Sequence, residues 1–217
     1  MIAQPSKIVC VGQNYAAHAK ELGNPIPSEP VLFQKAPSSW AGPFDPVELP
    51  PGAEKLDYEV ELGVVIGRRA KRVSEEESMD FIQGYLVLCD YSERSWQKER
   101  GGQFNKGKSH DGFCPAGPEV IPVTQIADPQ KLRIWSKVNG GIRQDSSTSD
   151  MVFNVRELVS YISKFMTLLP GDIIATGTPG GVGAGMKPPQ FLKVGDVVEM
   201  GVEGVGAIRQ EIVKTPG

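Results

Sequence analysis

One segment, residues 57–67, constrains the fold of this chain more than any other. It reads DYEVELGVVIG, and its first half alternates acidic and apolar side chains with a period of two, which predicts a β-strand. Glu59 and Glu61 then lie on one face of that strand, roughly 7 Å apart. The residues that alternate with them point the other way, into a core: Tyr58, Val60 and Leu62. Because residues 64–66 are all apolar, we expect the strand to be buried on both faces.

The two carboxylates of this strand need a counter-charge, since adjacent carboxylates at a buried position repel each other. A second apolar run, at residues 85–89, ends at Asp90, which would bring a third acid to a sheet edge. Three carboxylates make an all-oxygen site, and such a site favours Mg²⁺, Mn²⁺ or Ca²⁺ over zinc. The alternative is that Glu59 and Glu61 are solvated on an edge strand and that Asp90 only begins a turn.

The composition favours many short strands around one core. The chain has 217 residues, 40% of them hydrophobic, which is enough for one sizeable core and marginal for two. Its 25 glycines and 18 prolines are spread along the chain, as in proteins whose short strands are joined by tight turns. Since no linker separates two parts, we expect residues 1–217 to form a single domain.

Charge and cysteine content exclude several classes of protein. The formal net charge is −3 and no block of Lys or Arg stands out, so nucleic acid is not expected as a partner. No apolar run approaches the ~20 residues that span a bilayer, and the N-terminus lacks the pattern of a signal peptide. The chain has 3 cysteines, an odd number, and none is in C-x-x-C spacing. We therefore expect a cytoplasmic protein with reduced thiols and no membrane partner.

Local patterns predict the remaining elements. Strands are expected at residues 7–11, 31–35, 85–89 and 132–138, the last leading into a hairpin turn at 139–140. Helices are expected at residues 14–22 with Asn14 as the N-cap, at 74–82 with Ser74 as the cap, and at 154–169. A helical turn is expected at residues 92–98, and loops at 36–54 and 100–117. Gly-Asp turns at 171–172 and 195–196 each precede an apolar strand.

His18 and Glu21 are candidates for acid–base chemistry. They lie three residues apart on the expected helix and therefore share a face. A carboxylate beside a histidine can hold the imidazole as a general base that activates water. The alternative is a surface pair without consequence.

Several donors could bind an anionic substrate. Arg94 and Gln97 lie three residues apart after the Asp90 strand, and Lys108 lies in a Gly-rich segment. The loop at 176–183, which contains Gly177 and Thr178, has amides that could hold a carboxylate, and it lacks the Gly-Lys-Ser/Thr of a phosphate-binding P-loop. The alternative for the charged residues is solvated surface charge.

Taken in order, these motifs resemble the fumarylacetoacetate hydrolase family. The similarity begins at residues 11–15 (VGQNY), includes His18 and Glu21 and the DYEVEL strand, and continues through Asp90. It then includes residues 107–109 (GKS), 138–140 (VNG) and 170–179 (PGDIIATGTP). Each motif is weak alone, but their shared order covers nearly the whole chain. The chain looks like the compact acylpyruvase and 2-hydroxyhepta-2,4-diene-1,7-dioate isomerase branch.

The resemblance implies a strand-dominated α+β fold, a mixed β-sheet roll with a few peripheral helices, that forms a homodimer. It implies Mg²⁺ or Mn²⁺ held by Glu59, Glu61 and Asp90, and a helix bearing His18 and Glu21 that orders over bound substrate. Four further residues match family positions that contact the substrate or its oxyanion: Arg94, Gln97, Lys108 and Thr178. The pocket for the substrate side chain is expected to involve this helix and residues 36–54.

The implied activity is metal-dependent hydrolysis of the C3–C4 bond of a 2,4-diketo acid of the acylpyruvate type, through a metal-bound pyruvate enolate. His18 and Glu21 would activate water, and Lys108 would stabilise developing negative charge. Because one enolate serves several reactions, decarboxylation of an oxaloacetate-like acid and isomerisation of a hydroxymuconate-like diacid stay open. A metal-binding protein without turnover is a further alternative, although it would need none of His18, Glu21 and Lys108.

Overall fold

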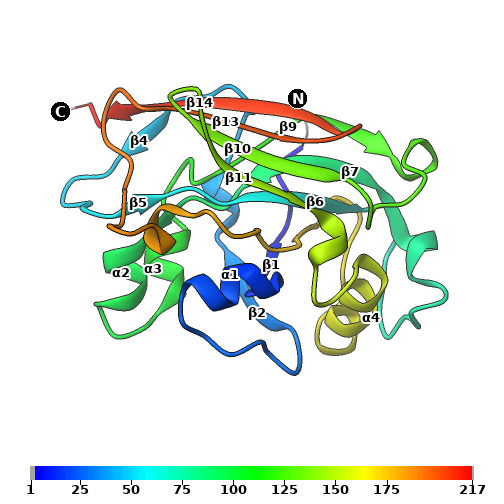
Figure 1. Ribbon diagram of the computed structural model, residues 1–217. Coiled ribbons are helices and arrows are strands. Elements are labelled where there is room, and N and C mark those ends of the chain that lie inside the picture. Colours follow the sequence, from blue (N-terminus) through cyan, green and yellow to red (C-terminus); the bar gives the residue numbers. More distant parts are fainter. Residues whose placement is uncertain (1–2, 217) are drawn as a thin grey trace.

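Two mixed β-sheets dominate the computed structural model, which describes residues 3–216 (Figure 1). The larger sheet has seven strands, in the order β2 (Val31–Lys35), β1 (Ile8–Gly12), β12 (Ile173–Ala175), β6 (Val60–Ile66), β7 (Ile82–Cys89), β9 (Cys114–Pro122) and β3 (Trp40–Ala41). The smaller has five, in the order β11 (Gly141–Ser147), β10 (Arg133–Val138), β13 (Val197–Val202), β14 (Gly206–Lys214) and β4 (Val47–Leu49). A short antiparallel pair is formed by β5 (Leu56–Asp57) and β8 (Ser92–Glu93).

The helices are short and lie on the side of the molecule away from β13 and β14 (Figure 1). They are α1 (Ala16–Glu21), α2 (Arg94–Lys98), α3 (Phe104–Lys108) and α4 (Val155–Phe165). Single 3-10 turns occur at Pro37–Ser39, Ser78–Phe81, Val123–Gln125, Thr148–Asp150 and Gly183–Gly185. The predicted strand-dominated α+β fold is therefore confirmed. Within the described part of the chain, no helix is both long enough and apolar enough to cross a membrane.

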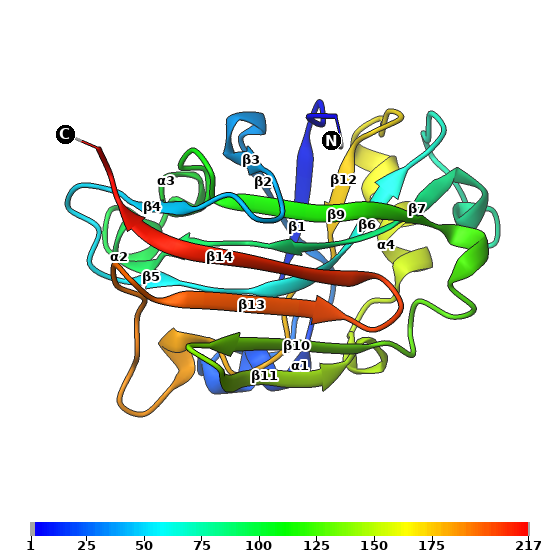
Figure 2. The ribbon, with the colours of Figure 1, turned by 90° about the horizontal axis from the view of Figure 1, so that it is seen from above.

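Strand β6 is buried on both faces, as its sequence predicts. Its even-numbered residues join the larger core with side chains of β10, β13 and β14, and β14 crosses over β6 in the view from above (Figure 2). Its other face joins a smaller core with β1, β9 and β12. Gly63 lies on this second face, where a Cβ atom would approach Leu86 Cδ1 to 2.4 Å, so close strand packing requires a glycine there.

Helix α4 and the hairpin of the smaller sheet form where the sequence predicts them. Asn154 and Glu157 make a reciprocal capping box at the start of α4, which ends at Phe165, four residues before the predicted end. The turn between β10 and β11 uses Asn139 at φ 52° and Gly140 at φ 78°, the positive angles that favour this residue pair. Both Gly-Asp turns precede strands as predicted, β12 and β13.

Four local predictions were wrong. Asn14 does not cap α1; its side chain instead bonds Thr176 O at 2.7 Å and Phe153 O at 3.0 Å, and thereby ties distant segments together. The helix predicted to begin at Ser74 is reduced to a 3-10 turn at Ser78–Phe81, and Ile82, predicted as part of its apolar stripe, is the first residue of β7. Both segments predicted as loops contain regular elements: 36–54 contains β3 and β4, and 100–117 contains α3 and the start of β9.

Candidate active site and metal centre

Three buried carboxylates, from Glu59, Glu61 and Asp90, meet at the end of β6 and β7. Each offers an oxygen, and these oxygens lie within 4.8 Å of one another. The antiparallel register brings them together, since Val60 pairs with Cys89 and the Asp90 amide donates to Glu59 O at 2.9 Å. The predicted convergence of these three acids at one edge is thus seen in the structure.

Three cations partly neutralise this acidic centre. Lys108 Nζ bridges Glu59 Oε2 at 2.6 Å and Asp90 Oδ2 at 2.5 Å. Arg94 Nη2 donates to Glu59 Oε1 at 2.6 Å. Lys35 Nζ donates to Asp90 Oδ1 at 2.6 Å and to the Tyr91 carbonyl at 3.1 Å, and its side chain is buried. Lys35 was not among the predicted site residues.

Glu61 is the one acid of this cluster without a salt-bridge partner among the described residues. Its Oε2 accepts only the amide of Gly177, at 2.7 Å. Burial, together with the negative charges of Asp90 and Glu59, raises the pKa of Glu61 well above its usual range. Glu59 shows the opposite behaviour: burial alone favours its protonated form, but Arg94 and Lys108 outweigh burial and hold its pKa well below the usual range. Cations therefore compensate Glu59 and Asp90, whereas no cation of the described chain pairs with Glu61.

These donors fit a hard divalent cation. All three are carboxylates, the set is buried, and the charge that lacks compensation sits on Glu61. A divalent ion at this point would ionise Glu61 and offset its repulsion with Asp90 and Glu59. Such a set suits Mg²⁺ or Mn²⁺ better than zinc, which prefers nitrogen and sulfur ligands.

Helix α1 brings a histidine to this centre. His18 Nδ1 lies 2.8 Å from Glu21 Oε1, and His18 Nε2 lies 3.9 Å from Glu59 Oε1. The Glu21 carboxylate accepts from Nδ1–H, which leaves Nε2 as the acceptor that faces the acidic centre. The second oxygen of Glu21 accepts the Gly181 amide at 2.8 Å, so the carboxylate is fixed from two sides. The predicted pairing of His18 and Glu21 is present.

Asp57 links the acidic centre to the loop after β12, a role that the sequence did not reveal. Its carboxylate accepts Arg94 Nε at 2.9 Å and the amides of Gly183 and Ala184 at 2.7 and 3.0 Å. Arg94 in turn contacts Glu59, so Asp57 fixes the guanidinium that pairs with Glu59. Asp57 is fully buried and is not one of the three clustered carboxylates.

The other predicted residues surround the same centre. Gln97 Oε1 accepts Arg94 Nη1 at 3.2 Å. The Thr178 hydroxyl donates to Val60 O at 2.8 Å and accepts Gln144 Nε2 at 2.7 Å. Because the Gly177 amide already donates to Glu61, a contact between this amide and a substrate stays a prediction. Lys108 lies on α3 rather than in a loop. Although burial disfavours its ammonium, Asp90 and Glu59 hold the pKa of Lys108 above its ordinary value.

A cavity of about 330 Å³ opens onto these groups. Its lining includes the predicted site residues His18, Glu59, Glu61, Arg94 and Lys108. Its remaining walls come from β1, α1 and the segments around them, β2, α2, α3 and the loop after β12: Val11, Gly12, Gln13, Leu22, Asn24, Phe33, Gln97, Lys98, Phe104 and Thr178. The helix that bears His18 contributes as predicted. Residues 36–54 do not line the cavity in the described chain, so the expectation that they form the side-chain pocket was wrong.

Comparisons with known proteins agree with this geometry. The family model described as "Fumarylacetoacetate (FAA) hydrolase C-terminal" matches residues 7–213. A protein of Burkholderia cenocepacia (strain HI2424) that carries the name of a hydrolase is 50% identical over 206 residues, which cover 94% of this chain and 73% of that protein.

Two solved structures show the same fold. Fumarylacetoacetate hydrolase from Exiguobacterium antarcticum has a TM-score of 0.90 and 42% identity, over 97% of this chain and 76% of that one. The 5-carboxymethyl-2-hydroxymuconate delta-isomerase of Mycobacterium smegmatis has a TM-score of 0.87 and 40% identity, over 99% of this chain and 81% of that one.

Proposed function

Because this chain belongs to the fumarylacetoacetate hydrolase family, we propose that it is a divalent-metal-dependent hydrolase that cleaves the C3–C4 bond of 2,4-diketo acids of the acylpyruvate type. The substrate is a small 2-oxo acid, and the metal is Mg²⁺ or Mn²⁺ held by Glu59, Glu61 and Asp90. The family resemblance also supports a cytoplasmic homodimer, and we include both in the proposal.

The observation that carries the proposal is the position of His18. Its Nδ1 is engaged by Glu21, while its Nε2 faces the acidic centre, 3.9 Å from Glu59. A site that only bound a metal would need neither the histidine nor its carboxylate. A hydrolase needs a base within reach of a water molecule beside the substrate, and the position of His18 at the acidic centre supports that role.

When bound, the cation would supply a Lewis acid for the 2-oxo acid and stabilise negative charge on it. His18 Nε2 takes a proton from water, and the resulting hydroxide adds to the C4 carbonyl. The C3–C4 bond then breaks, its electron pair stays with the three-carbon fragment, and C3 gains a proton. One diketo acid and one water thus give pyruvate and a carboxylic acid. Glu21 holds the imidazole and stabilises its protonated form.

Lys108 and Arg94 contribute positive charge on the same side of the cavity. Lys108 Nζ lies between Glu59 and Asp90, where its charge stabilises anionic oxygens of the reacting acid. Arg94 is fixed by Asp57 and Gln97. It therefore keeps Glu59 ionised and offers a rigid donor beside the substrate.

A second candidate is isomerisation of a hydroxymuconate-like diacid. It is favoured by the isomerase of Mycobacterium smegmatis, whose fold matches with 40% identity. The same acidic centre would bind the 2-oxo acid, and His18 would move a proton between carbons rather than activate water. Decarboxylation of an oxaloacetate-like acid would use the same groups.

One substrate panel separates these activities. Purified protein with Mg²⁺ or Mn²⁺ is incubated with acetylpyruvate, fumarylpyruvate, oxaloacetate and a 2-hydroxymuconate-type diacid, while the ultraviolet absorbance and pyruvate release are followed. We expect loss of the enol absorbance with one pyruvate formed per acylpyruvate consumed, and no reaction in EDTA. Turnover of the diacid or of oxaloacetate alone would replace the hydrolase by the isomerase or the decarboxylase. Absence of turnover with every substrate and both metals would refute the enzyme proposal.

A further inference from the structure

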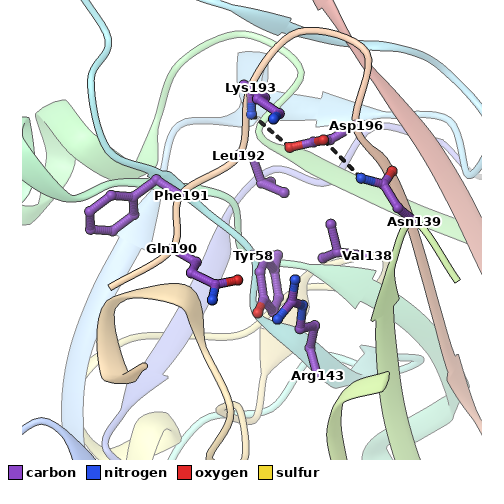
Figure 3. Close-up of a pocket in the computed structure, with 9 residues that line it drawn as sticks. All are labelled: Tyr58, Val138, Asn139, Arg143, Gln190, Phe191, Leu192, Lys193 and Asp196. Atoms are coloured by element: carbon purple, nitrogen blue, oxygen red, sulfur yellow. Dashed lines mark hydrogen bonds between the residues drawn. The ribbon is translucent and has the colours of Figure 1, made fainter. Parts of the chain in front are cut away.

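A second cavity, of about 290 Å³, lies on the opposite side of the acidic strand from the metal centre. Tyr58 forms part of its wall and Glu59, the next residue, faces the first cavity, because successive side chains of an extended chain point in opposite directions. The two cavities share no lining residue. The walls of the second are Tyr58, Val138, Asn139, Arg143, Gln190, Phe191, Leu192, Lys193 and Asp196 (Figure 3).

Arg143 brings a positive charge into this cavity, and its guanidinium makes no salt bridge within the described residues. Its guanidinium lies beside the Tyr58 ring (Figure 3), and its Nη1 donates a hydrogen bond to Met186 Sδ at 3.6 Å. Arg133, on the partner strand of the same hairpin, instead pairs with Asp145 at 2.8 Å. A half-buried guanidinium without a carboxylate partner favours an anion that accepts from its planar donors.

Asp196, the one acid that lines the cavity, already accepts hydrogen bonds on both of its carboxylate oxygens. Asp196 accepts the Asn139 side-chain amide and the Lys193 backbone amide, each at 2.9 Å, as the dashed lines in Figure 3 show. Lys193 adds a second cation at the exposed rim. Positive charge therefore exceeds negative charge around the space between Arg143 and Gln190.

The remaining walls are apolar and the space is small. Val138 and Leu192 are buried, and their side chains face the cavity together with the Tyr58 ring (Figure 3). The volume lies near the lower end of the ~300–1,000 Å³ typical of small-molecule sites. A compact anion with a flat or short apolar body fits these walls better than a bare inorganic ion.

We propose that this cavity is a binding site for a small aromatic or short-chain carboxylate, distinct from the catalytic centre, with Arg143 as its anchor. The carboxylate accepts from the guanidinium of Arg143, and the apolar body packs against Tyr58, Leu192 and Val138. The exposed side chain of Gln190 closes the open side. Nothing in this binding step requires the metal or the proposed reaction.

The site is connected to the catalytic base by a short chain of contacts. The Tyr58 hydroxyl donates to Gly181 O at 3.1 Å, and the Gly181 amide donates to Glu21. Gly181 has φ +105°, and a Cβ atom there would lie 2.1 Å from Arg143 O, so the Gly181 and Arg143 backbones are in contact. A ligand that orders Arg143 and Tyr58 therefore also affects the position of Gly181, whose amide holds Glu21.

Benzoate is a suitable probe because it combines a carboxylate with a flat apolar body. Its binding to metal-free protein is measured by calorimetry, which keeps this test independent of catalysis. We expect saturable binding in the millimolar range or tighter, at least tenfold weakening in R143Q, and no change in R133Q, the matched arginine of the same hairpin. Neutral benzamide and inorganic phosphate should each bind at least tenfold more weakly than benzoate.

Two further measurements check the benzoate result independently of R143Q. Q190W fills the cavity from an exposed position and should also abolish binding, so the conclusion does not depend on R143Q folding well. In amide spectra of the wild type, benzoate should shift the Gly181 N–H signal in parallel with saturation. Equal benzoate affinity in the wild type, R143Q and Q190W would overturn the proposal, as would no saturable binding. Phosphate binding as tight as benzoate would overturn the carboxylate assignment.

Discussion

His18 Nδ1 lies 2.8 Å from Glu21 Oε1, and this contact determines which nitrogen of the imidazole faces the acidic centre. Glu21 is itself fixed by the Gly181 amide, so the orientation of the ring depends on a loop about 160 residues further along the chain. The pair therefore acts as one preorganised unit rather than as a helical salt bridge between solvated groups.

Replacement of His18 by glutamine should separate metal binding from catalysis. The variant lacks the proposed base but keeps all three carboxylates, so kcat with the substrate that the panel identifies should fall by roughly 10²–10⁴-fold. Mn²⁺ affinity, measured by calorimetry, should stay within a few-fold of the wild type. His110, the other histidine, is the matched control, and H110Q should retain activity. A near-normal kcat in H18Q would remove His18 as the base.

Glu61 should be indispensable for the metal. Its carboxylate is the member of the cluster without a cationic partner, so Glu61→Gln removes the charge that a cation would neutralise. Loss of a direct ligand should cost at least the roughly 10–100-fold in affinity that is typical for supporting residues. Mn²⁺ titration calorimetry checks this, with the exposed Glu119→Gln as control. Unchanged affinity in Glu61→Gln would contradict the assignment of the site.

Metal binding should release a proton from Glu61, because burial and its acidic neighbours raise its pKa in the metal-free protein. Mn²⁺ affinity should therefore rise as the pH increases toward that pKa and level off above it. Calorimetry in buffers of different ionisation enthalpy would reveal the proton directly. No dependence on the buffer would mean that Glu61 is already ionised without metal.

The raised pKa of Glu61 also makes the metal-free protein less stable as the pH increases, whereas metal affinity increases. A raised pKa in the folded state means that the folded protein holds a proton that the unfolded chain has lost above about pH 4.3. Stability from Glu61 is thus full below that pH and falls as the pH rises through the folded pKa. Glu59, whose pKa is lowered, contributes stability above the unfolded pKa and loses it only in stronger acid. Metal-free protein should therefore melt at lower temperature as the pH rises from the unfolded pKa toward the folded pKa of Glu61, and Mn²⁺ should remove that loss.

The sequence predicted the acidic centre because local rules govern its parts. Alternation places Glu59 and Glu61 on one face, and Asp90 ends the neighbouring apolar run. Only the register was missing, and antiparallel pairing of Val60 with Cys89 supplied it. Helical spacing predicted the pairing of His18 with Glu21, and the resemblance to the family contributed the place of Lys108 beside the substrate.

The failures occurred where tertiary packing decides the outcome. Gly107 looked like part of a flexible loop, yet a Cβ atom there would lie 2.5 Å from Glu93 O and 2.7 Å from Gln97 Cβ. The glycine therefore permits α3 to pack against α2 and bring Lys108 to the site. Asp57 lies in the most informative segment, but its role depends on amides at 183 and 184, which no local pattern connects to it.

Lys35 is the clearest case of a residue that only the fold reveals, and it supports a further prediction. In the sequence it is a lysine at the end of a short strand, a position where lysines are usually solvated. In the structure the residue is 1% exposed, and its ammonium reaches Asp90 Oδ1 at 2.6 Å. Removal of one partner leaves a buried carboxylate with less compensation, which typically costs about 3–5 kcal/mol.

Lys35→Met should therefore lower the free energy of unfolding by about 3 kcal/mol, measured by urea denaturation in EDTA. Lys55, whose pair with Glu99 is exposed, is the control, and Lys55→Met should leave stability nearly unchanged. Combining Lys35→Met with Asp90→Asn should recover part of the loss, because the second change removes the uncompensated charge. Equal stability of Lys35→Met and Lys55→Met would show that Lys108 alone suffices to neutralise Asp90. Mn²⁺ added to Lys35→Met should restore more stability than it adds to the wild type, since the cation then replaces the missing charge beside Asp90.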